Sequence, residues 1–153
     1  MLEVDREEMP KVRSKHSKGR PNWLPPHTYM QVYHYCMNYS VYKDEYAQLM
    51  HDVGISGMTY DGMPGGNFKT GSATENQAIR LAEVGENIKT IEDAVKTACA
   101  KYPALEPYML QAVTTETNFD LMSEVNHIPC GKNLYHSIRQ HILYLVARKR
   151  KWW

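Results

Sequence analysis

The sequence predicts an all-α protein: a helical bundle of two long helices and a short helix, with a C-terminal helix-turn-helix. Three observations support this. Apolar residues recur about every 3.6 residues through most of the chain beyond Pro26, no segment alternates as a strand does, and Gly and Pro separate the periodic segments. With 153 residues and a hydrophobic share of 42%, the chain is long enough to bury one core.

Residues 1–26 are expected to form a flexible basic arm. This segment offers few apolar side chains for burial, and Ser, Gly and Pro lie between its cations. The cations that we expect to contact a polyanion from this arm are Lys11, Arg13, Lys15, Lys18 and Arg20.

Residues 27–116 are expected to form a helical body. Its first long helix is predicted from about Thr28 to Val53, and the tyrosines that recur along it at helical spacing are assigned to the core. A Gly-rich loop is predicted over residues 54–71, because this segment contains six glycines.

The second long helix is predicted to start at a capping box, in which Ser72 precedes Glu75 by three residues. Its apolar stripe starts at Ile79 and continues to about Lys101, and Gly85 within it indicates either a close helix crossing or a bend. Pro103 ends it, and a short third helix follows from about Leu105 to Thr115.

Residues 117–151 are expected to form the helix-turn-helix, followed by a basic tail that reaches residue 153. A short apolar helix is interrupted before Pro129, and helical periodicity resumes after Gly131. In a helix-turn-helix the second helix enters the major groove and its first residues reach base edges. The side chains that the pattern places outward on this helix are Lys132, Asn133, His136, Arg139 and Gln140.

The charge is strongly uneven, although the whole chain carries only +1. Residues 21–124 carry a net −7, whereas residues 125–153 contain six Lys or Arg and no acid. An acidic body with a basic end indicates that a polyanion is contacted from one side. The tail cations are Arg148, Lys149, Arg150 and Lys151, and Trp152-Trp153 after them are expected to fold back, seal a dimer or enter a partner.

Other classes of function find little support. No nucleophile or metalloprotease motif is present, and the glycine-rich GMPGGNFKTGS lacks the spacing of a phosphate loop, so we expect no enzyme activity and no cofactor. His136 and His141 lie five residues apart on different helix faces, so no metal site is expected. Three cysteines without a CxxC pair, no apolar run of 18 residues and a charged N-terminus indicate a cytoplasmic protein outside the membrane.

Several pieces of the chain resemble small phage and prophage proteins related to the RinA/ArpU-like transcriptional regulators. These pieces are Ser56-Gly57-Met58 with Gly62-Met63-Pro64, the helix start Ala73 to Glu83, and Ile128-Pro129-Cys130 leading into the last helix. The resemblance implies a sigma-factor-like helix-turn-helix that binds double-stranded promoter DNA and activates late phage genes in the bacterial host cell. The family pattern tends to place Arg or Lys at the positions of Ile138, Gln140 and His141, so this chain is expected to make fewer phosphate contacts.

Two functions therefore stay open. The first is a phage-encoded DNA-binding transcriptional regulator of the late-gene activator type. The alternative is a phage inhibitor or adaptor, anti-CRISPR-like, whose repurposed helix-turn-helix binds a host protein or nucleoprotein such as RNA polymerase or a CRISPR effector. A homodimer is open in both cases, because helix-turn-helix proteins often read paired half-sites.

Overall fold

The computed structural model describes the backbone of residues 19–62 and 71–153, and the side chains of residues 19–52 and 74–153. Within these ranges the chain forms six helices and no strand, which confirms the all-α prediction. The elements are α2 (Pro26–Met37), α3 (Tyr39–Gly62), α4 (Gly71–Ala98), the 3₁₀ turn η1 (Pro103–Leu105), α5 (Glu106–Thr114), α6 (Phe119–Glu124) and α7 (Lys132–Lys149).

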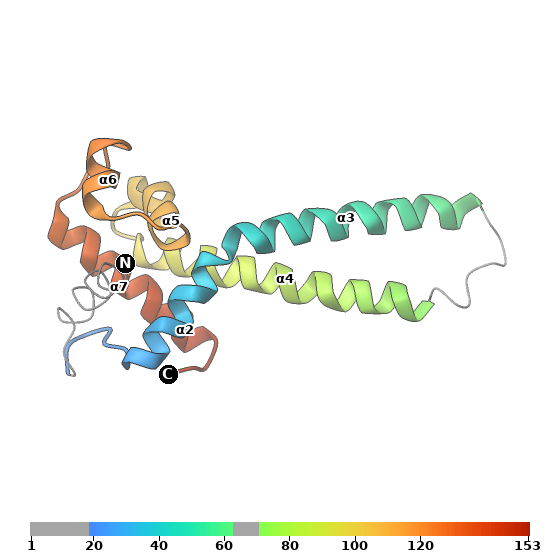
Figure 1. Ribbon diagram of the computed structural model, residues 1–153, viewed down its shortest axis with the longest axis horizontal. Coiled ribbons are helices and arrows are strands. Elements are labelled where there is room, and N and C mark those ends of the chain that lie inside the picture. Colours follow the sequence, from blue (N-terminus) through green and yellow to red (C-terminus); the bar gives the residue numbers. More distant parts are fainter. Residues whose placement is uncertain (1–18, 63–70) are drawn as a thin grey trace, which may run out of the picture.

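Two parts are distinct in Figure 1. The head contains α2, α5, α6, α7 and the C-terminal part of α4, whereas α3 and the rest of α4 project from it as a long hairpin, which we call the arm. The core lies in the head, where α7 packs against α2, α4 and α5. Its fully buried side chains include Val32, Cys36, Ile91, Cys99, Met109, Met122, Ile142 and Val146.

The single first helix predicted over residues 28–53 is wrong, because the chain bends at Asn38. Asn38 adopts φ −82° and ψ 5°, and its N–H donates to the carbonyl of His34 at 3.2 Å as α2 ends. The next helix begins at once, since the N–H of Tyr42 donates to the carbonyl of Asn38 at 2.9 Å. Asn is a poor helix-interior residue, but the apolar period continues across it, so periodicity alone does not reveal the bend.

The Gly-rich loop is shorter than predicted. Residues 54–62 continue α3 as helix, and α4 already begins at Gly71. The backbone is therefore helical at Gly54 and Gly57, although glycine in a helix interior costs roughly 1 kcal/mol per residue relative to alanine. The part of the predicted loop between residues 63 and 70, and the side chain of Ser72 in the predicted capping box, lie outside the described residues.

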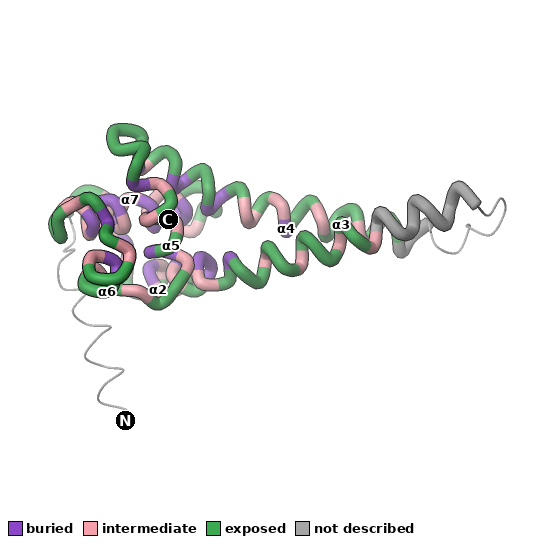
Figure 2. The backbone as a smooth tube through the Cα atoms, turned by 90° about the horizontal axis from the view of Figure 1, so that it is seen from above, coloured by how far each residue is buried: buried purple, intermediate pink, exposed green. Residues whose placement is uncertain are grey.

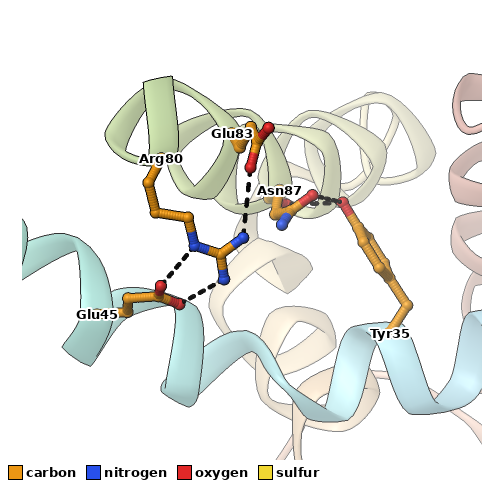
Figure 3. Close-up of polar contacts among 5 residues, drawn as sticks. All are labelled: Tyr35, Glu45, Arg80, Glu83 and Asn87. Atoms are coloured by element: carbon orange, nitrogen blue, oxygen red, sulfur yellow. Dashed lines mark hydrogen bonds and ion pairs between the residues drawn. The ribbon is translucent and has the colours of Figure 1, made fainter. Parts of the chain in front are cut away.

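The arm is an antiparallel helix pair with a narrow seam. A Cβ added to Gly85 on α4 meets the Tyr46 ring of α3 at 3.3 Å, so the close crossing, one of the two explanations predicted for Gly85, is the observed one. Where the arm joins the head, the Tyr35 hydroxyl donates to Oδ1 of Asn87 at 2.9 Å (Figure 3). The Tyr39 hydroxyl donates to Oε1 of Glu92 at 2.5 Å.

Both ends of the described chain meet on the head. Trp152 packs edge-on against Tyr35, with ring centroids 5.3 Å apart, and Trp153 packs edge-on against Trp23 at 5.6 Å. The terminal tryptophans therefore fold back, which was one of the predicted alternatives. This contact also places residues 20–25 beside the end of α7.

Candidate nucleic-acid interface

The short helix α6 forms where the sequence predicts it. Asn118 is its N-cap, and its Oδ1 accepts a hydrogen bond from the N–H of Leu121 at 2.8 Å. Such a cap satisfies one of the four N–H groups that a helix start leaves without a partner. Met122 is fully buried beneath α6, and the Phe119 ring packs against Tyr135 of α7 with ring centroids 5.4 Å apart, so these two side chains hold α6 to the head.

A tight turn joins α6 to α7. His127 takes a positive φ of 54°, which lets the chain reverse within a few residues. The N–H of Ile128 then donates to the carbonyl of Met122 at 3.1 Å, and the buried Ile128 side chain anchors the turn. Gly131 precedes α7 with extended backbone and provides no side-chain cap to it.

The first two turns of α7 carry the exposed part of the predicted site. Lys132 and Asn133 are exposed, as predicted. His136 is half-buried, with its ring packed edge-on against Tyr135 at 5.2 Å. Ser137 is exposed beside them and was missed by the sequence reasoning, although it lies one helical turn after Asn133 on the same face.

Arg139 does not face outward, contrary to the prediction. Its guanidinium is half-buried and donates from Nη1 to the hydroxyl of Tyr29 on α2 at 2.9 Å. Burial acts to lower the pKa of Arg139, but interactions with Tyr29, Tyr135 and Tyr33 outweigh it and hold this pKa above its ordinary value. Arg139 therefore keeps its charge and joins α7 to α2.

Gln140 does not face outward either. Its side chain is only 3% exposed, and its Nε2 donates to the backbone carbonyl of Asn22 at 2.7 Å. Asn22 takes a positive φ of 64°, which turns the segment before α2 across this side of α7. The prediction was wrong because a helical pattern identifies polar positions but not a distant segment that covers them.

The basic tail is only partly available to a partner. Arg150 lies over the rings of Tyr35 and Trp152, 5.3 Å and 5.2 Å from their centroids. Arg148 donates from Nη1 to the carbonyl of Trp153 at 3.2 Å. Lys149 and Lys151 are exposed and make no ion pair within the described residues.

The structure describes only one cation of the basic N-terminal segment predicted over residues 1–26. Arg20 is exposed, close to the Asn22 carbonyl that Gln140 binds. Lys11, Arg13, Lys15 and Lys18 lie outside the described residues. The described candidate interface thus consists of α6, the turn and the first two turns of α7. The exposed cations Lys149 and Lys151 lie at the other end of α7, about 25 Å from Lys132, and Arg20 lies in the segment before α2.

The described residues form no metal site and no membrane-spanning helix. Among the described side chains, those of residues 19–52 and 74–153, no three His, Cys, Asp or Glu lie close enough together to hold a metal ion. No helix in the same described ranges combines the length and apolar character needed to cross a membrane. Comparison of the chain with protein-family models, with curated proteins and with solved structures finds no match.

Proposed function

We propose that this protein is a phage-type transcriptional regulator that binds duplex DNA through α6 and α7. The observation that carries the proposal is the exposed start of α7. This part of α7 exposes the side chains of Lys132, Asn133 and Ser137, and it follows a capped short helix and a tight turn. The resemblance of the IPCGKNLY turn to phage regulators points to the same function.

In the proposed complex the start of α7 lies in the major groove. Asn133 has the donor and acceptor that match the N6 and N7 atoms of adenine, and Lys132 matches the O6 and N7 acceptors of guanine. The uncapped N–H groups at the start of α7 are suited to a phosphate oxygen. The DNA phosphates on either side of the groove are contacted by Lys149, Lys151, Arg20 and the cations of residues 1–18.

Arg139 and Gln140 have a different role in this proposal. Their hydrogen bonds to Tyr29 and Asn22 fix the rotation of α7 relative to α2 and to the chain before it. They are positioning residues, because they orient the reading surface without contributing to it. The number of phosphate contacts is then smaller than the sequence pattern implies.

The test is the salt dependence of binding to random-sequence duplex DNA, measured by fluorescence anisotropy at about 50 and 200 mM salt. The four exposed cations Lys132, Lys149, Lys151 and Arg20 give a slope of about −3.6 in log K against log[salt], or about a 10²-fold loss of affinity over this range. The cations of residues 1–18 make the slope steeper. An affinity that changes less than about threefold contradicts the proposal.

The second candidate is a phage inhibitor or adaptor that binds a host protein or nucleoprotein. The observation that favours it is the charge of α3 and α4, where residues 39–52 and 74–98 hold eight Asp or Glu against four Lys or Arg. An acidic helix pair can occupy a surface that normally binds nucleic acid. Co-elution with purified RNA polymerase, lost when DNA is added, supports this candidate. Separate elution at micromolar concentrations of both proteins counts against it.

A further inference from the structure

All three tryptophans of the chain lie where the segment after α7 meets α2 and the residues before it. Trp152 packs edge-on against Tyr35 of α2, and Trp153 packs edge-on against Trp23. These contacts are on the head, where most of the buried residues gather (Figure 2), and they place the end of the chain beside α2 (Figure 1). We call these four aromatic residues, together with the cations Arg148, Lys149, Arg150 and Lys151, the tail junction.

The segments that build the tail junction contain no carboxylate side chain. Residues 19–43, which include all of α2, hold no Asp or Glu, and neither do residues 125–153. Where α4 reaches Tyr35, the contact is made by the uncharged Asn87. The four cations of the junction are exposed and form no ion pair within the described residues. The junction is therefore a positively charged surface that suits a polyanion.

Trp153 is fixed in position while its ring stays accessible. Lys151 takes a positive φ of 59°, which turns the chain back after α7, and the Trp153 carbonyl accepts from Nη1 of Arg148 at 3.2 Å. The Trp153 side chain is nevertheless 48% exposed. Its ring plane is at 78° to that of Trp23, and such an edge-on contact covers at most one of its two faces. A flat partner that stacks on this ring therefore meets a side chain that folding has already ordered.

We propose that the tail junction binds single-stranded nucleic acid, with a base stacked on Trp153 and the phosphates on the cations around it. Proteins that bind single strands without sequence preference combine a positively charged surface with aromatic side chains on which bases stack. A duplex cannot use Trp153 in this way, because its bases are already stacked on one another. The proposal thus goes beyond duplex binding by the start of α7, with which it shares only the phosphate contacts of Lys149 and Lys151.

The test is the binding of the full chain to an oligothymidylate of about 12 nucleotides, which has no duplex structure. Affinity is measured by fluorescence anisotropy at about 50 mM salt, and stacking by the quenching of intrinsic tryptophan fluorescence. Trp153→Ala is expected to weaken binding by about tenfold or more, which is the contribution of one base stacked on an aromatic ring. Trp153→Tyr keeps a ring and is expected to recover most of this affinity. Lys149→Ala is expected to reduce the salt slope by about 0.7, the value for one phosphate of a single strand.

The matched control is Tyr102→Ala, which removes a ring of similar exposure, 45%, just before η1. It is expected to leave the affinity for the oligothymidylate unchanged. Circular dichroism shows whether each variant keeps its helices. A duplex of the same length is expected to bind the wild-type protein and Trp153→Ala equally.

The proposal is overturned if the wild-type protein does not bind the oligothymidylate, or if Trp153→Ala binds it as tightly as the wild type does. It is also overturned if Trp153→Tyr binds as weakly as Trp153→Ala, or if Tyr102→Ala is equally weakened. Loss of duplex and single-strand binding together in Trp153→Ala would show that Trp153 only supports the fold. Duplex binding by the start of α7 is tested separately by Lys132→Ala, which is not expected to affect the oligothymidylate, so either proposal can fail without the other.

Discussion

Arg139 of α7 donates a hydrogen bond to the hydroxyl of Tyr29 on α2, with 2.9 Å between the two atoms. This contact joins the helix proposed to read DNA to the first helix of the head. Arg139 makes no ion pair with a carboxylate in the described structure, so a neutral hydroxyl is the hydrogen-bond partner of this half-buried charge.

Tyr29→Phe is therefore expected to destabilise the head by about 1–2 kcal/mol. Hydrogen bonds to charged groups contribute roughly 1.5–3 kcal/mol, and partial exposure of Arg139 reduces this value. The measurement is the free energy of unfolding in urea. Tyr108→Phe is the control, because the half-buried Tyr108 hydroxyl forms no hydrogen bond within the described residues, and its removal should cost less. Equal effects of both changes would show that the Tyr29–Arg139 bond contributes nothing measurable.

Lys132→Ala is expected to reduce the salt slope of DNA binding by about 0.9 without changing stability. The reason is that an exposed lysine in contact with one phosphate releases about one counterion. Lys89→Ala is the control, because Lys89 is also exposed but lies on α4, outside the proposed reading surface. If Lys89→Ala lowers the slope as much as Lys132→Ala does, the start of α7 is not the DNA-binding surface.

Stability is expected to fall between about pH 10 and 12. Burial raises the pKa of Tyr35 to about 12, and the nearby positive charge of Arg150 opposes this shift only in part. A tyrosine whose folded-state pKa is raised stabilises the fold fully below its unfolded pKa, about 10, and loses this contribution as pH rises through the folded value. One unit of pKa difference corresponds to about 1.4 kcal/mol, so the loss should amount to about 3 kcal/mol at most.

Tyr35→Phe separates this group from the other tyrosines. The variant loses the hydrogen bond to Asn87 at every pH below 10, so it starts less stable. Its urea midpoint should then fall less steeply than that of the wild-type protein between pH 10 and 11.5. Parallel pH profiles for the two proteins would mean that Tyr35 ionises as readily in the folded state as in the unfolded state.

The three cysteines are expected to differ in their reaction with iodoacetamide. Burial raises the pKa of Cys36 to about 12 and that of Cys99 to about 11, and both thiols are fully buried in the head. Cys130 is half-buried in the turn before α7 and should be alkylated first, because the thiolate must form and be reached. Peptide mass mapping over time measures the order. Early alkylation of Cys36 in the folded protein would contradict the packing of α2 against α7.

Local chemistry in the sequence was sufficient to predict the helices of the C-terminal region. α6 ends at Glu124, within the short apolar helix predicted before Pro129, and the apolar period after Gly131 runs through α7 to Lys149. α2 begins at Pro26, two residues before the predicted Thr28. These signals act within one or two turns of backbone, so they do not depend on the rest of the fold.

The face of a helix that becomes buried was harder to predict. The sequence placed Ile79 on the inner stripe of α4, but Ile79 is 54% exposed and Val84 is fully buried instead. Both residues fit an apolar stripe, and the choice between them depends on the rotation at which α4 meets α3. That rotation is decided by contacts between distant residues, such as Glu45 with Arg80 and Tyr46 with Gly85.

The sequence alone thus determined that the chain is helical and that a short helix, a turn and a longer helix follow one another near its end. The tertiary structure decided which polar residues of α7 remain available to a partner. Lys132, Asn133 and Ser137 are left in solvent, whereas Arg139 and Gln140 bind Tyr29 and Asn22. The physical reason is that helix formation follows from local spacing and capping. The residues that bury one side of α7 lie more than 100 positions away in the chain.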